Sequence, residues 1–226
     1  GVGGTPISLR ATVQSISAGD TIRFFTSGDN PVVRANTGTL SATVLWEVFD
    51  QATGLPISGD PDFLITDIDG NGGNPIESVS AACAGLTSYT VNGAYLDGCD
   101  ANTNTMCESN IRVSESGGSI LAEGTQNQNA GQQEGYMQYS WTDVSSWTVS
   151  YFATTGGRWY VHDADGDIPF DGTRVDINLV DLATIKGVTS GSLTSPAQGE
   201  EITFQIDLSN ACLLYTSDAA DESLWV

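Results

Sequence analysis

The chain is poor in basic residues and in long apolar runs, and each shortage excludes a class of function. Its 7 Lys and Arg face 28 Asp and Glu, which gives a net charge of −21. Such a charge repels phosphate backbones and anionic lipids, so binding to nucleic acid or to a membrane surface is disfavoured. No apolar run is long enough to span a bilayer. Acids dispersed in this way suit an extracellular setting rich in divalent cations.

Familiar catalytic motifs are also missing. The sequence contains no Walker loop, no dinucleotide fingerprint and no G-x-S-x-G elbow. Zinc is disfavoured because there is no C-x2-C pair and His162 is the one histidine. His162 precedes three aspartates, so it is either a ligand or base or, more commonly, a surface residue at a strand end. We therefore predict a protein without catalysis.

The composition favours an all-β fold. There are 26 glycines, strong helix formers are sparse, and about ten short strands separated by turns can be counted before residue 163. In Thr43–Phe49 and Ser146–Phe152 apolar and polar residues alternate, which places Trp46 and Trp147 in a core. A hairpin is expected across Gly117-Gly118, and Gly124–Gly135 reads as an exposed loop. We predict an antiparallel β-sandwich, of jelly-roll or Ig-like type.

The stretch Phe63–Asn74, FLITDIDGNGGN, is the feature around which we expect the chain to be organised. Phe63–Ile68 reads as a buried strand, and the glycines after it predict a turn with unusual backbone angles. In extended backbone Asp67 and Asp69 leave the same face, where two carboxylates repel unless something neutralises them. They either cap the turn through backbone N–H groups or bind calcium at the strand end.

A second acidic loop follows His162. Asp163, Asp165 and Asp167 surround Gly166, whose register does not fit an EF-hand. We interpret this loop as a calcium site that joins Asp67 and Asp69 if both loops lie at one end of the sandwich. The alternative is a solvated turn.

Aromatic residues and cysteines suggest two further features. Tyr139 and Trp141 are candidates for a sugar-stacking platform, as in carbohydrate-binding modules, with core packing as the alternative. Cys99 and Cys107 flank a polar loop and predict a local disulfide in an oxidising compartment. A Cys83–Cys99 bond, or three unpaired cysteines, remain open alternatives.

Two segments resemble known families. FLITDIDG at 63–70, ESVSA at 77–81 and SSWTVSYFATTGGR at 145–158 resemble a β-sandwich module of large secreted bacterial surface proteins. VDLATIKGVTSGSLTSPAQGEEITFQIDLSN at 180–210 resembles the opening strands of an Ig-like domain of unknown function that occurs in tandem in bacterial cell-surface proteins. The matching positions of the second motif are Asp181, Leu182, Lys186, Pro196, Gly199, Glu200, Thr203, Phe204 and Asn210.

The end of the chain resembles the translation of a sequencing adapter, as found in proteins predicted from shotgun metagenomes, in the string CLLYTSDAADE at 212–222. The predicted organisation is therefore a β-sandwich module over 1–174, the truncated start of an Ig-like repeat over 175–211, and an artefact tail over 212–226.

The resemblances imply a fragment of a multidomain extracellular stalk or adhesin, and they bring no catalytic residues. We expect a structural or adhesive module of a secreted cell-surface protein, stabilised by calcium. Its partners would be neighbouring β-sandwich domains and surface glycans, without membrane insertion of this fragment. A carbohydrate-binding module is the alternative.

Overall fold

The computed structural model describes residues 6–28, 30–36, 38–93, 109–127, 131–163, 168–177, 182–190 and 203–210. The chain divides into two compact units, 1–177 and 178–226. The first unit contains β1 (Ile7–Ile16), β2 (Ile22–Ser27), β3 (Asn30–Ala35), β4 (Leu40–Asp50), β5 (Asp62–Thr66), β6 (Gly70–Asn71), β7 (Asn74–Pro75), β8 (Glu77–Ala82), β9 (Leu86–Val91), β10 (Ile111–Ser116), β11 (Ser119–Gly124), the 3₁₀ turn η2 (Gln133–Gly135), β12 (Met137–Trp141), β13 (Ser146–Ala153), β14 (Trp159–Asp163) and β15 (Thr173–Asp176).

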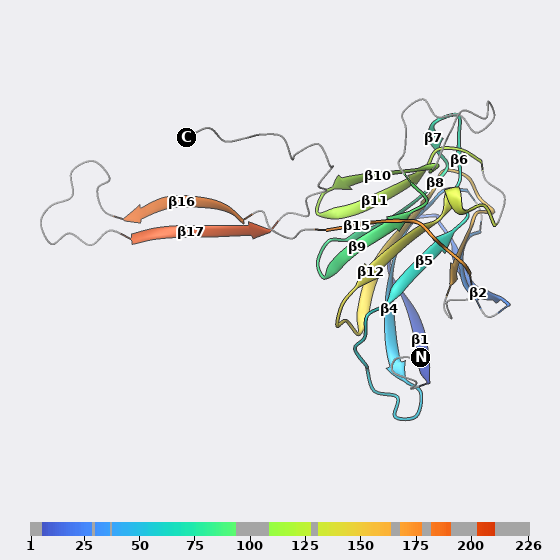
Figure 1. Ribbon diagram of the computed structural model, residues 1–226, viewed down its shortest axis with the longest axis horizontal. Coiled ribbons are helices and arrows are strands. Elements are labelled where there is room, and N and C mark those ends of the chain that lie inside the picture. Colours follow the sequence, from blue (N-terminus) through green and yellow to red (C-terminus); the bar gives the residue numbers. More distant parts are fainter. Residues whose placement is uncertain are drawn as a thin grey trace, which may run out of the picture. The chain divides into compact units, whose positions relative to one another are not determined.

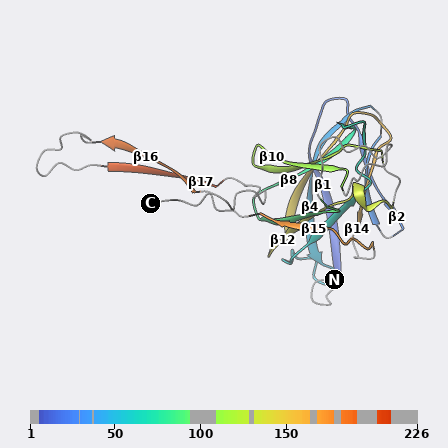
Figure 2. The ribbon, with the colours of Figure 1, turned by 45° about the horizontal axis from the view of Figure 1, so that its top comes forward.

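The first unit is an antiparallel β-sandwich, which confirms the predicted fold class (Figure 1). A six-stranded sheet has the order β1-β4-β13-β8-β11-β10, and a seven-stranded sheet has the order β15-β9-β12-β5-β14-β3-β2. Figure 2 shows the same arrangement from a second direction. The short strands β6 and β7 pair with each other outside both sheets.

Aromatic rings fill the space between the two sheets. The alternation predicted for β4 and β13 is confirmed, since Trp46, Trp147 and Tyr151 are 2%, 6% and 0% exposed. The rings of Trp46 and Trp147 lie 5.1 and 5.3 Å from that of Phe63 in the opposite sheet. Tyr151 likewise contacts Tyr160 at 5.1 Å. Burial of such large rings supplies most of the hydrophobic stabilisation of a sandwich.

The hairpin predicted over Gly117-Gly118 is confirmed by the pairing of β10 with β11. The exposed loop predicted after it is wrong at its start, because Thr125 and Gln126 are 1% and 2% exposed. Their carbonyls accept the backbone N–H groups of Gly73 and Gly70 at 2.9 and 2.7 Å. This segment therefore packs under the glycine-rich turn.

The second unit contains one described antiparallel ladder, β16 (Leu182–Ser190) with β17 (Thr203–Asn210). The boundary between the units lies after Ile177 rather than after residue 174. The reason is that β15 pairs with β9, and the Ile177 N–H donates to the Thr87 carbonyl at 2.8 Å. In the described part of the chain no helix has the length and apolarity needed to cross a membrane.

Candidate functional site: a buried carboxyl cluster

The strand at the centre of the organising stretch ends earlier than predicted. β5 stops at Thr66 because Asp67 has a φ of 63°, in the left-handed region. The backbone is thus not extended across Asp67 and Asp69, and the premise that both side chains leave one face does not hold. The predicted glycine turn is confirmed, since Gly72 and Gly73 have φ values of 56° and 83° and connect β6 to β7.

The turn brings Glu77 back onto the backbone of Asp69. The Asp69 N–H donates to Oε2 of Glu77 at 2.8 Å, and the Glu77 N–H donates to the Asp69 carbonyl at the same distance. Glu77 is 1% exposed. A carboxyl group is therefore sealed inside the sandwich at the first residue of β8, where it closes the turn.

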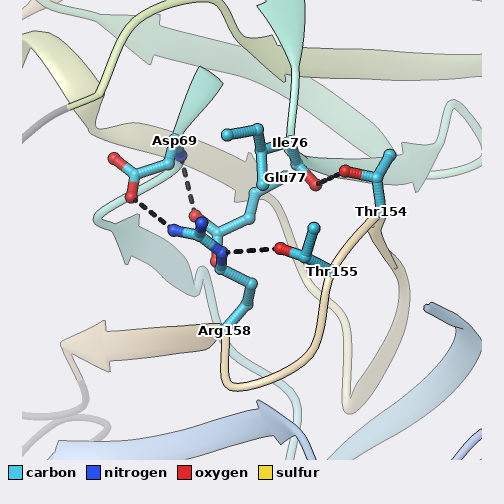
Figure 3. Close-up of polar contacts among 6 residues, drawn as sticks. All are labelled: Asp69, Ile76, Glu77, Thr154, Thr155 and Arg158. Carbon is cyan, nitrogen blue, oxygen red and sulfur yellow. Dashed lines mark hydrogen bonds and ion pairs between the residues drawn. The ribbon is translucent and has the colours of Figure 1, made fainter. Parts of the chain in front are cut away.

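The cation of the cluster comes from a turn that is distant in the sequence. Arg158, between β13 and β14, donates from Nη1 to Oδ2 of Asp69 at 3.0 Å and from Nε to the Thr155 hydroxyl at 3.1 Å. Figure 3 shows this arrangement, together with the bond from Thr154 to the Ile76 carbonyl. The ion pair joins the end of β5 to the connection between the two sheets.

Two carboxyl groups here have raised pKa values. Burial raises the pKa of Glu77 to about 8, and the nearby Asp69 and Asp67 carboxylates contribute in the same direction. Burial also raises the pKa of Asp67 to about 6, followed by repulsion from Asp69, while Arg158 acts the other way. Carboxyl groups with raised pKa values are found in catalytic acids, but also in structural networks. Here the Glu77 carboxyl accepts a hydrogen bond from the backbone N–H of Asp69, which is a structural role.

This geometry does not support the calcium site predicted at Asp67 and Asp69. The charge of Asp69 is neutralised by Arg158, not left for an ion. Among the described residues no group of three or more His, Cys, Asp and Glu side chains is suited to hold a metal. Asp163 accepts the Ile168 N–H at 3.2 Å. Asp165 and Asp167 lie outside the described residues, so the second predicted calcium loop stays a prediction.

His162 is not at the surface. It is fully buried, with Nε2 lying 2.8 Å from the Tyr151 hydroxyl and Nδ1 lying 3.0 Å from the Pro31 carbonyl. Because a carbonyl only accepts, Nδ1 carries the proton and Tyr151 donates to Nε2. The Trp46 N–H in turn donates to the Tyr151 oxygen at 3.1 Å. These bonds cross from the six-stranded to the seven-stranded sheet, and burial lowers the pKa of His162 to about 4.

The predicted sugar platform is corrected by burial. Tyr139 and Trp141 are 0% and 3% exposed, so neither ring presents a face to a ligand. The Tyr139 hydroxyl donates to the carbonyls of Val79 and Ile120 at 3.1 and 3.0 Å, across the sandwich. The core-packing alternative describes these two residues, because a buried tyrosine must satisfy its hydroxyl.

Cys83 is the one cysteine among the described residues. Cys83 is disulfide-bonded, which excludes the alternative in which it is a free thiol. The predicted Cys99–Cys107 bond lies outside the described residues. Which cysteines pair was beyond reach of the sequence, because four cysteines allow three connectivities.

A cavity of about 340 Å³ lies at the opposite end of the sandwich from the carboxyl cluster. Phe63 and Trp147, near the starts of β5 and β13, line it, with Asp60 and Asp62 among the other lining residues. Those two acids are engaged in local structure: Asp60 accepts the Asp143 N–H at 2.8 Å, and Asp62 accepts the Ser140 hydroxyl at 2.6 Å.

Four of the described titratable groups thus connect separate parts of the fold. Glu77, Asp69 and Arg158 join a turn to a sheet junction, and His162 joins the sheets. These contacts join residues that are distant in the sequence, so local sequence patterns could not have predicted them. Comparison with known proteins adds no assignment, since no family model matches the sequence and no curated protein is similar to it.

Proposed function

We propose that the chain is a structural and adhesive module of a secreted cell-surface protein, without catalysis. The observation that carries this proposal is the placement of the first and last strands of the sandwich. β1 forms one edge of the six-stranded sheet, whereas β15 forms an edge of the seven-stranded sheet. The polypeptide therefore enters in one layer and leaves in the other.

The two edges are also on opposite flanks. β4, the neighbour of β1, packs through Trp46 against Phe24 of β2 and His162 of β14. β12, two strands from β15, bonds through Tyr139 to β8 and β11. β1 thus faces the β2 side and β15 the β11 side. A pull on the two ends is opposed by both sheets and by the core between them, as a spacer requires.

Mechanical unfolding tests this role. With attachment points at residues 6 and 177 of the full chain, we expect the sandwich to unfold in one cooperative step whose extension matches the whole module. Early peeling of β1 or β15 at low force would contradict a spacer. A substrate-profiling assay that detects turnover by the intact chain would contradict the absence of catalysis.

Secretion is supported by the disulfide at Cys83 and by the acidic charge. A structural disulfide typically stabilises a fold by about 2–4 kcal/mol. We expect a reductant to lower the melting temperature of the folded protein. An unchanged melting temperature in the reduced protein would remove this support.

Calcium stabilisation belongs to the proposal for Asp163, Asp165 and Asp167 alone. Oxygen ligands brought close repel until a divalent ion joins them, so binding would raise stability by mass action. Melting curves recorded in calcium, in magnesium and in chelator test whether calcium binding stabilises the protein. Identical curves would exclude calcium.

A further inference from the structure

The few cations of this acidic chain divide into two groups. Four arginines of the described residues form ion pairs with acids: Arg10 with Glu47, Arg112 with Glu123, Arg158 with Asp69 and Arg174 with Asp176. Arg23 and Arg34 form no ion pair with the acids in the part of the chain that the structure describes. Acids outnumber bases fourfold, so acidic partners are abundant. Two arginines without such a partner are therefore unexpected.

These two arginines are neighbours on one sheet. In the register of β2 with β3, Arg23 lies directly opposite Arg34, and in the register of β3 with β14, Arg34 lies opposite Trp159. The three residues form one row across three strands, and residues directly opposite in a sheet project from the same face. Like charges in this position destabilise the sheet unless an anion lies between them.

The row is on the outer face of the seven-stranded sheet. The neighbouring positions Val33 and Tyr160 point inward: Val33 is 0% exposed, and Tyr160 contacts Tyr151 of the other sheet. The side chains of the row therefore point away from the core. Arg23 is exposed, and Trp159 is 38% exposed although it is a large aromatic residue.

The aromatic residues hold the second guanidinium in place. Cζ of Arg34 lies over the Trp159 ring, 5.3 Å from its centroid, and the Phe25 ring meets Trp159 edge-on at 5.0 Å. Nε of Arg34 is buried and has no hydrogen-bond partner in the described structure. A buried donor without an acceptor costs free energy, so the site lacks one acceptor.

We propose that Arg23, Arg34 and Trp159 form a binding site for an acidic glycan, in which a hexuronate carboxylate pairs with the arginines and the sugar ring lies against Trp159. Guanidinium groups match the planar geometry of a carboxylate, and the C–H face of a pyranose packs on aromatic carbon. This site goes beyond the structural role proposed above and does not depend on it.

The position of the row favours a glycan over a peptide strand. A peptide that extends the sheet would pair with the edge of β2 and lie beside it, whereas Arg34 and Trp159 are on the second and third strands from that edge. The ligand must therefore lie flat across the strands. A dense polyanion is disfavoured because the net charge of −21 repels it at long range. Single carboxylates spaced along a sugar chain meet both conditions.

Calorimetric titration of the full chain with an oligosaccharide in which glucuronate alternates with neutral sugars tests the proposal, with its methyl-esterified form as the neutral control. We expect binding of the acid form alone. Replacement Arg23→Gln with Arg34→Gln should weaken that binding at least about tenfold. Trp159→Ala, with both arginines intact, should also weaken it, because the ring contact is lost.

The matched control is Arg10→Gln with Arg174→Gln, which changes the net charge equally. Arg10 also lies over an aromatic ring, Phe49, at 4.3 Å, but it is paired with Glu47. We expect this variant to keep its affinity within about twofold. Near-ultraviolet circular dichroism verifies that each variant is folded. No binding by the wild type, equal weakening in both double variants, no effect of Trp159→Ala, or tighter binding of heparin or of a poly-Glu peptide would each overturn the proposal.

Discussion

The hydroxyl of Tyr151 lies 2.8 Å from Nε2 of His162, in a space that solvent does not enter. This bond requires the neutral imidazole, because a protonated Nε2 would point a hydrogen at the hydroxyl that donates to it. Protonation would also place a charge in an apolar core. The hydrogen bond between Tyr151 and His162 is therefore kept only while His162 remains neutral.

Acid should weaken the fold through His162. Its pKa is about 4 in the folded protein against 6.5 ordinarily, so the unfolded chain binds more protons between these values. The contribution of neutral His162 to stability is therefore fully present above about pH 6.5 and is lost as the pH falls toward 4. We expect this group alone to lower the free energy of unfolding by about 3 kcal/mol at pH 4, measured by urea unfolding from pH 7 to 4.

Raised carboxyl pKa values act in the opposite direction over part of this range, so a variant isolates the histidine. His162→Gln removes its titration and should lower stability at pH 7. The difference in unfolding free energy between wild type and variant should then shrink as the pH falls. A difference that stays constant from pH 7 to 4 would show that His162 does not titrate in this way.

Glu77 predicts a change at higher pH. Its folded pKa is about 8 against an ordinary 4.5, so the folded protein binds more protons in this window and stability falls as the pH rises through it. Glu77→Gln keeps an acceptor for the Asp69 N–H and cannot ionise. We expect the variant to equal wild type near pH 4 and to be more stable by at least about 1 kcal/mol at pH 9, measured by denaturant unfolding. Equal stability at pH 9 would refute the buried-acid interpretation.

Sequence patterns foretold the sheets better than the site. One-sided burial imposes an alternation of period two, which is why the strands around Trp46 and Trp147 were predictable. Asp69 meets Arg158 across 89 positions, and no local pattern encodes such a contact. His162 stands before an acidic run that suggests the surface, yet its ring is enclosed by residues of distant strands.

Two further errors have a common physical origin. Tyr139 and Trp141 resemble a stacking platform because amphipathic rings suit both an interface and a core. Thr125 and Gln126 look exposed because polar residues usually are, but their carbonyls serve the turn at Gly70 and Gly73. In both cases hydrogen bonds to distant backbone make the burial of polar groups possible.

The ion pair at the carboxyl cluster should be costly to break from one side. Arg158→Met leaves Asp69 buried without its cation, and we expect a loss of about 2–4 kcal/mol in the free energy of unfolding. When Asp69→Asn is added to the Arg158→Met variant, part of the lost stability should be restored, because no uncompensated charge remains. Thermal or urea unfolding of the wild type, the Arg158→Met and Asp69→Asn single variants and the double variant forms a double-mutant cycle.

Arg10→Met is the matched control for this cycle. Arg10 also pairs with a carboxylate at 2.9 Å, but its side chain is 58% exposed, so the solvent screens the lost charge. We expect a much smaller effect than at Arg158. Equal effects at the two positions would mean that burial does not strengthen the Asp69 pair.

Gly70 and Gly124 should tolerate no side chain at all. A Cβ on Gly70 would lie 2.1 Å from the Gly124 carbonyl oxygen, and one on Gly124 would lie 2.4 Å from the Ile68 carbonyl oxygen. Both obstacles are backbone, so relief requires the turn and β11 to separate. We expect Gly70→Ala to cost about 3 kcal/mol or more, or to prevent folding.

Gly117→Ala is the control, because its Cβ meets no atom within 4 Å while its φ of +59° costs about 1–2 kcal/mol. Soluble yield and melting temperature compare the two, and a Gly70→Ala protein as stable as Gly117→Ala would show that the turn does not pack against β11 as described.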